Sequence, residues 1–94
     1  MSAAAPPTWD QAEAARLLAE LRAAVDAQRR AFGGSFPAPL SAVVADYLAV
    51  AEGYVANHEA EAARGWDAMQ LLAGVRPRLT EIIRRARQDR RQVG

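Results

Sequence analysis

Apolar residues recur along this chain at helical spacing in two long stretches, which are separated by a short break. Within residues 9–32 and again within residues 39–64, most apolar positions lie three or four residues apart. This spacing gathers side chains on one face of an α-helix. Between the stretches, Gly33 and Gly34 favour the end of a helix, and Pro39 suits the first position of the next one. The pattern therefore predicts two long helices joined by a tight turn.

The last third of the chain carries two further interruptions. Gly65 predicts the end of the second helix, and Asp67 is placed to cap the start of a following one. The apolar stripe also continues through Gly65, so a single helix across this point stays open as the alternative. Gly74 and Pro77 predict a second interruption, because proline lacks a backbone donor and its ring clashes with the preceding turn. The predicted helices are about 9–32, 39–64, 67–74 and 77–91.

These elements predict an all-α fold, since no alternating strand pattern accompanies them and alanine, arginine and leucine all favour helices. We expect an antiparallel αα-hairpin of two long helices, with a shorter C-terminal segment that is broken near Gly74 and Pro77. A helix of about 24 residues is about 36 Å long, so one short, broken segment cannot cover both apolar stripes. We therefore expect a second copy to complete a homodimeric helical bundle. The residues expected between the copies are Leu18, Leu21, Val25, Leu40, Val44, Tyr47 and Tyr54.

The length of 94 residues corresponds to one domain. Residues 1–7 are rich in alanine and proline and are predicted to form a disordered leader, followed by a helical domain over 8–94 that opens with a capping box of Thr8 and Gln11. Cysteine is absent, which excludes disulfides and thiolate sites. No secretory signal is seen, and no apolar run approaches the roughly 20 residues that span a bilayer. We therefore expect a cytoplasmic protein without a membrane partner.

Charge is divided unevenly along the chain. Residues 1–75 contain five arginines and nine acidic residues, a net charge of −4, whereas residues 76–94 contain seven arginines and two acidic residues, a net charge of +5. Such asymmetry indicates an interaction surface. Two interpretations stay open: the basic segment pairs with acidic residues of the same protein, of which Glu52, Glu59 and Glu61 are candidates, or it binds a polyanion such as nucleic acid. The candidate binding residues are Arg76, Arg84, Arg87, Arg90 and Arg91.

His58 is the only histidine, and it lies on the apolar stripe of the second predicted helix. We expect it to be partly buried and satisfied by a hydroxyl or a carboxylate. His58 and Glu59 begin the zinc-protease pattern His-Glu-x-x-His, but Ala62 stands where the second histidine belongs. A di-iron bundle would place a glutamate three residues before the histidine, and Val55 stands there. We therefore predict no metal site, no cofactor and no catalytic residues.

Together these patterns favour a small non-enzymatic helical adaptor that self-associates and binds an unidentified macromolecular partner. The alternative is a nucleic-acid-binding accessory protein, such as a phage- or plasmid-type packaging, partition or transcription factor, which would use the basic C-terminal helix. The salt dependence of binding to nonspecific DNA separates the two functions, because phosphate binding weakens steeply as salt rises.

Overall fold

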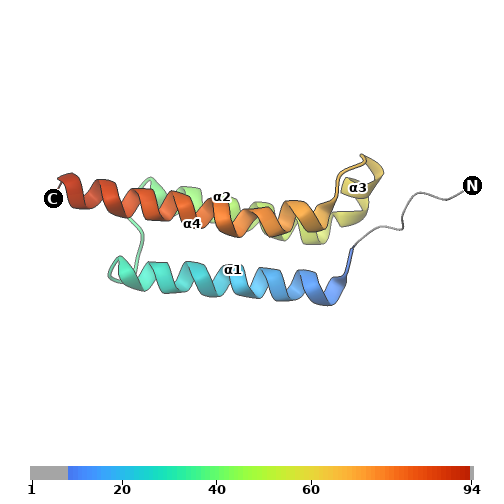
Figure 1. Ribbon diagram of the computed structural model, residues 1–94, viewed down its shortest axis with the longest axis horizontal. Helices are drawn as coiled ribbons and strands as arrows, with labels where there is room; N and C mark the ends of the chain where they lie inside the picture. The colour runs from blue at the N-terminus through green and yellow to red at the C-terminus, as the bar shows by residue number, and fades with distance from the viewer. Residues whose placement is uncertain (1–8, 94) are drawn as a thin grey trace, which may run out of the picture.

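The computed structural model describes residues 9–93 of the chain, with side chains up to Asp89. This part folds into four helices: α1 (Gln11–Ala31), α2 (Leu40–Ala56), α3 (His58–Ala63) and α4 (Ala68–Val93) (Figure 1). No strand occurs within residues 9–93, and the all-α prediction is confirmed. The predicted leader, residues 1–7, and the predicted capping residue Thr8 lie outside the described residues.

The three long helices, α1, α2 and α4, lie side by side, and the short α3 sits at one end of them (Figure 1). α1 and α4 run in the same direction, and α2 runs in the opposite direction (Figure 1). α4 packs on both α1 and α2, whereas α1 and α2 contact each other less extensively. α4 is therefore the central helix of the packing, not a short segment that closes a hairpin.

The start of α1 is set by Asp10, not by the residue that the sequence suggests. Asp10 Oδ1 accepts hydrogen bonds from two backbone amides of the first helical turn, at 3.0 and 3.1 Å. The predicted cap begins two residues earlier, at Thr8, and uses the side chain of Gln11. That side chain instead accepts a hydrogen bond from the indole Nε1 of Trp9 at 3.0 Å. Because Asp10 is the cap, α1 begins at the next residue, Gln11.

Glycines end α1 and α3 in the same way. Gly33 and Gly34 have φ values of 89° and 111°, and their amides donate at 3.0 Å to carbonyls in the last turn of α1. After α3, Gly65 has a φ of 84°, and the amide of Trp66 donates back to the Glu61 carbonyl at 3.0 Å. Glycine adopts this left-handed conformation without strain. The break predicted at Gly33 and Gly34 is therefore present. A break is also present at Gly65, but it ends α3 and not the second long helix.

The connection between α2 and α4 has one predicted and one unpredicted feature. Asp67 Oδ1 accepts from two backbone amides in the first turn of α4, at 3.0 and 3.3 Å, which is the expected cap. The unpredicted feature is Asn57, whose backbone and side-chain amides both donate to the carbonyl of Gly53, at 2.9 and 3.1 Å. α2 therefore ends at Ala56, and α3 is a separate short helix.

The break predicted near Gly74 and Pro77 is wrong, because α4 continues through both residues. Pro77 lies on the exposed side of α4, while Val75, Leu79 and Ile83 are buried on the opposite side. Fully burying side chains of this size stabilises by about 1.5–3 kcal/mol each, and a proline inside a helix costs about 3 kcal/mol. Several buried contacts on both sides of Pro77 therefore outweigh the local penalty.

Burial within a single chain accounts for most of the predicted apolar stripes. The buried core consists of Ala14, Leu21, Val25, Phe36, Leu40, Val44, Ala51, Leu72, Val75, Leu79 and Ile83. Because the uninterrupted α4 covers both α1 and α2, several residues predicted between two copies have almost no surface left to offer: Leu21, Val25, Leu40 and Val44. The others are partly buried against the same core: Leu18, Tyr47 and Tyr54.

Candidate functional site

A groove between α2 and α4 is left open, and no residue of α1 lines it. Its volume is about 370 Å³. Val50 is 46% exposed in it, because this residue flanks the apolar stripe of α2 and does not reach the core. The α2 wall consists of Asp46, Tyr47, Val50 and Tyr54, and the α4 wall of Gln70, Leu71, Gly74, Val75 and Arg78.

One acidic and one basic side chain stand at the same end of this groove. Asp46 comes from α2 and Arg78 from α4, and the two helices run in opposite directions. Both residues are exposed, and neither makes an ion pair with another residue of the described chain. Their charges are therefore available to a molecule that enters the groove.

The α4 wall of the groove contains a glycine that the single chain does not need. A Cβ atom at Gly74 would meet nothing within 4 Å, so no close contact inside the chain requires glycine there. A glycine inside a helix costs about 1 kcal/mol relative to alanine. Gly74 therefore leaves an open recess in the wall at the expense of helix stability.

Sequence reasoning found part of this site. Tyr47 and Tyr54 belong to the predicted interface and do line the groove. Gly74 is misread as a helix break, although glycine in a helix also signals close approach of another backbone. Other groove residues were not predicted, because they flank the core stripes and come together only when the two helices pack. They include Asp46, Val50, Gln70, Leu71 and Arg78.

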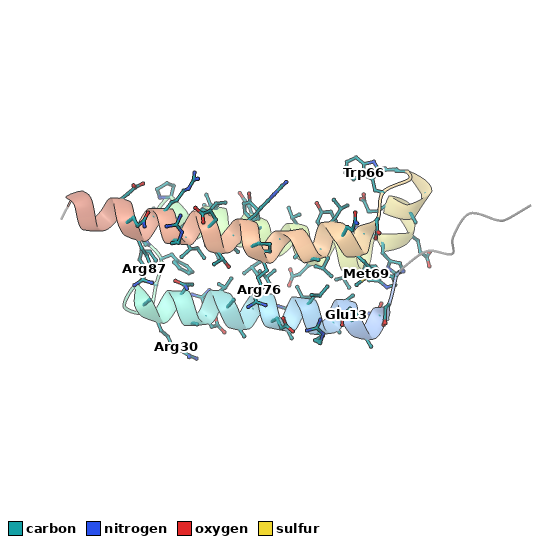
Figure 2. The ribbon with its side chains drawn as sticks, viewed as in Figure 1. Glu13, Arg30, Trp66, Met69, Arg76 and Arg87 are labelled. Carbon is teal, nitrogen blue, oxygen red and sulfur yellow. The ribbon has the colours of Figure 1, made fainter. Side chains whose placement is uncertain are left out.

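The arginines of the predicted binding set whose side chains are described, Arg76, Arg84 and Arg87, are distributed along α4. Arg76 donates to Glu20 Oε1 of α1 at 3.0 Å, and Figure 2 shows Arg76 between the two helices. Arg84 Nε donates to Glu81 Oε1 one turn earlier at 3.1 Å. Arg87 makes no ion pair with any residue that the structure describes. The side chains of the other two lie outside the described residues: Arg90 and Arg91.

The carboxylates predicted to face this basic segment are not its partners in the described chain. Glu52 pairs with Arg22 across the contact between α2 and α1. Glu61 lies 3.9 Å from Arg64, and Glu59 makes no ion pair within residues 9–89. Pairing with these three carboxylates is therefore absent for the described arginines of the set, but Arg76 does pair with another acidic residue of the same chain, Glu20. For Glu59 and Glu61 the reason is distance, because α3 lies at the opposite end of the bundle from the C-terminal half of α4 (Figure 1).

Local ion pairs shift the protonation of two exposed carboxylates. Hydrogen bonds from Arg84 and then Arg85 lower the pKa of Glu81 below its ordinary value of 4.5, and partial desolvation opposes them. The pKa of Glu13 is lowered in the same way, first by its hydrogen bond from Arg16. Exposed pairs of this kind contribute little to stability. The pairs of Glu81 with Arg84 and Arg85 neutralise part of the positive charge of α4.

The fold nevertheless concentrates cations at one end of the bundle. Arg29 and Arg30, in the last turn of α1, lie at the same end as the last turns of α4 (Figures 1 and 2). Arg30 and Arg87 make no ion pair within the part of the chain whose side chains are described. Cations near a helix C-terminus are stabilised by the helix dipole, so part of this cluster has a purely structural role.

His58 is held by a ring stack and a backbone hydrogen bond. Its ring lies 4.2 Å from that of Trp9, with an angle of 1° between the planes. Its Nδ1 lies 3.1 Å from the carbonyl oxygen of Val55, and since a carbonyl only accepts, Nδ1 carries the proton. The predicted partner, a hydroxyl or carboxylate, is therefore wrong. Within residues 9–89, no three histidine, aspartate or glutamate side chains come together as a metal site would require.

Comparisons with known proteins identify no relative of this chain. The chain matches no protein-family model, and no curated protein or solved structure is significantly similar to it. Among the described helices, none combines the length and the apolar character needed to cross a bilayer.

Proposed function

We propose that this protein is a small non-enzymatic helical interaction module that self-associates and binds a macromolecular partner. The observation that supports this proposal is the groove between α2 and α4, which the rest of the described chain does not cover. It combines an exposed valine, two tyrosines and an open glycine recess. Tyrosines are enriched at protein interfaces because they offer a large apolar area together with a polar group.

The sole histidine has a structural role in the described chain. The Nδ1 of His58 is committed to a backbone carbonyl, and the stacked indole of Trp9 covers one face of its ring. These contacts join the start of α1 to the end of α2.

Self-association is tested by light scattering or sedimentation of the full chain over the micromolar range. A dimer is expected to weigh twice the 10.1 kDa of one chain. Val50→Asp places a charge in the groove and is expected to weaken association by at least about tenfold, since burying an unpaired charge is strongly unfavourable. The matched control is Ala49→Asp, at the exposed neighbouring position that does not line the groove. A wild-type particle of 10.1 kDa throughout would refute self-association.

Nucleic-acid binding is the second candidate function, and the observation that favours it is the basic end of the bundle. Arg30 and Arg87 are available there to contact phosphates. Fluorescence anisotropy with a nonspecific DNA duplex, at several salt concentrations, tests this function. Arg30→Gln together with Arg87→Gln is expected to reduce the slope of log K against log salt by up to about 2, because each phosphate contact contributes about 0.9. Absence of binding at low salt would exclude it.

A further inference from the structure

The two walls of the α2/α4 groove complement each other residue by residue. Because α2 and α4 run in opposite directions, the lining residues face each other in reversed order. Asp46 is then level with Arg78, an acid opposite a base. Val50, the exposed apolar side chain, is level with Gly74, the open recess.

The third level of the groove repeats this relation. Tyr54 on α2 is level with Gln70 on α4, so a phenol stands opposite an amide with which it can form a hydrogen bond. The α2 wall thus presents an acid, an apolar knob and a phenol, and the α4 wall presents a base, a recess and an amide. A surface whose two halves match each other in this way is self-complementary under two-fold rotation.

We propose that the occupant of this groove is a second copy of the chain, related by a two-fold axis that runs along the groove, so that α2 of each copy packs on α4 of the other. This proposal rests on the self-association proposed above and specifies its geometry. Rotation about such an axis keeps every residue at its own level and exchanges the walls. Asp46 of each copy then meets Arg78 of its partner, and Val50 of each copy enters the recess at Gly74.

The resulting arrangement is a four-helix bundle of two α2 and two α4 helices, with the α1 helices outside. α2 and α4 are antiparallel within one chain, and the rotation makes them antiparallel across the interface too, so all neighbouring helices alternate in direction. This is the common arrangement of four-helix bundles. Glycine at position 74 allows the backbone of α2 from the other copy to approach closely.

A two-fold axis across the groove is the competing geometry, and the charges disfavour it. That rotation reverses the levels, so Asp46 and Arg78 would face the end of the partner's groove that carries Tyr54 and Gln70. The ionic groups would then lack charged partners in the interface, and burying an unpaired charge is costly. It would also place Val50 near Val50 of the partner, and leave both glycine recesses facing each other.

Charge reversal tests the proposed pairing. Asp46→Arg alone and Arg78→Asp alone are each expected to raise the dimer dissociation constant at least about tenfold, because each creates like charges at both pairs. The double variant Asp46→Arg with Arg78→Asp restores opposite charges and is expected to return the constant to within about threefold of wild type. Circular dichroism should be unchanged throughout, since both positions are exposed.

Cysteine cross-linking distinguishes the two axes, and the natural chain contains no cysteine to interfere. An equimolar mixture of Val50→Cys chains and Gly74→Cys chains is expected to form mixed disulfide dimers on oxidation, with little cross-linking of either variant alone. Efficient cross-linking of Val50→Cys chains to each other would overturn the proposed axis. So would failure of the double charge reversal to restore dimerisation. If either result is obtained while the wild type is a dimer, the proposed axis is refuted but self-association stands. A strictly monomeric wild type refutes both proposals.

Discussion

Replacing Pro77 by alanine distinguishes between two possibilities: the continuous α4 of the structure and the broken helix that the local sequence predicts. Pro77 has no amide hydrogen, so the carbonyl of Ala73, one turn earlier in α4, lacks its usual helical donor. Both residues are exposed. Pro77→Ala supplies that donor and removes the ring without disturbing any core side chain.

The expected gain follows from the position of Pro77 inside a helix. Proline there is about 3 kcal/mol less favourable than alanine. The alanine variant also gains freedom in the unfolded chain, which offsets up to about 1 kcal/mol. We therefore expect the free energy of unfolding to rise by about 2 kcal/mol. For a domain of this size, that corresponds to an increase of about 8–16 °C in the melting temperature.

Thermal and urea unfolding followed by circular dichroism measure this gain. Thr80→Ala is the matched control, because Thr80 is an exposed residue of the same helix and its replacement gains less than about 0.7 kcal/mol. The opposite outcome belongs to a helix that begins at Pro77, where proline is well suited to the first position. A Pro77→Ala variant that is no more stable than wild type, or less stable, would show that α4 is not continuous.

Three further predictions follow from burial, backbone and charge. Leu79→Ala, at a side chain only 1% exposed, is expected to lower the free energy of unfolding by about 2–5 kcal/mol in urea titrations, and a loss below 0.5 kcal/mol would contradict the core. Gly53→Ala and Gly74→Ala should each stabilise the chain by up to about 1 kcal/mol, but only Gly74→Ala should weaken dimerisation in sedimentation, since Gly53 does not line the groove. Because the pKa of Glu81 is lowered in the folded state, its carboxylate stabilises that state above about pH 4.5, and this effect is lost as pH falls through the pKa of the folded state. The difference in melting temperature between wild type and Glu81→Gln should therefore vanish in acid. A difference that stays constant with pH would argue against the ion pair with Arg84.

The proposed dimer also accounts for two features that the single chain leaves without a structural reason. Val50 exposes nearly half of its surface, and Gly74 lowers the stability of α4 with no packing contact to require it. Both are explained if the native form buries this groove. The unpaired charges of Asp46 and Arg78 acquire the same explanation, because each becomes the other's partner across the two-fold axis.

Local sequence signals were enough to predict the all-helical class, the end of α1 and the start of α4, but not the end of α2 at Ala56. Helix periodicity, the glycine pair at 33 and 34, and the cap at Asp67 all act within a few residues, through backbone dihedral preferences and local hydrogen bonds. Such signals do not depend on the rest of the fold. They can therefore be recognised from the sequence without knowledge of the packing.

How these helices share their surfaces depends on contacts between distant parts of the chain. Local chemistry argues for a break at Pro77, but burial of Leu79 and Ile83 against α1 and α2 keeps α4 intact. Because α4 is continuous, it covers residues such as Leu21 that the sequence assigns to a second copy. The apolar side chain that stays uncovered in the α2/α4 groove is instead Val50. Contacts between elements far apart in the chain outweigh a local penalty of a few kcal/mol, and no pattern along the sequence measures those contacts.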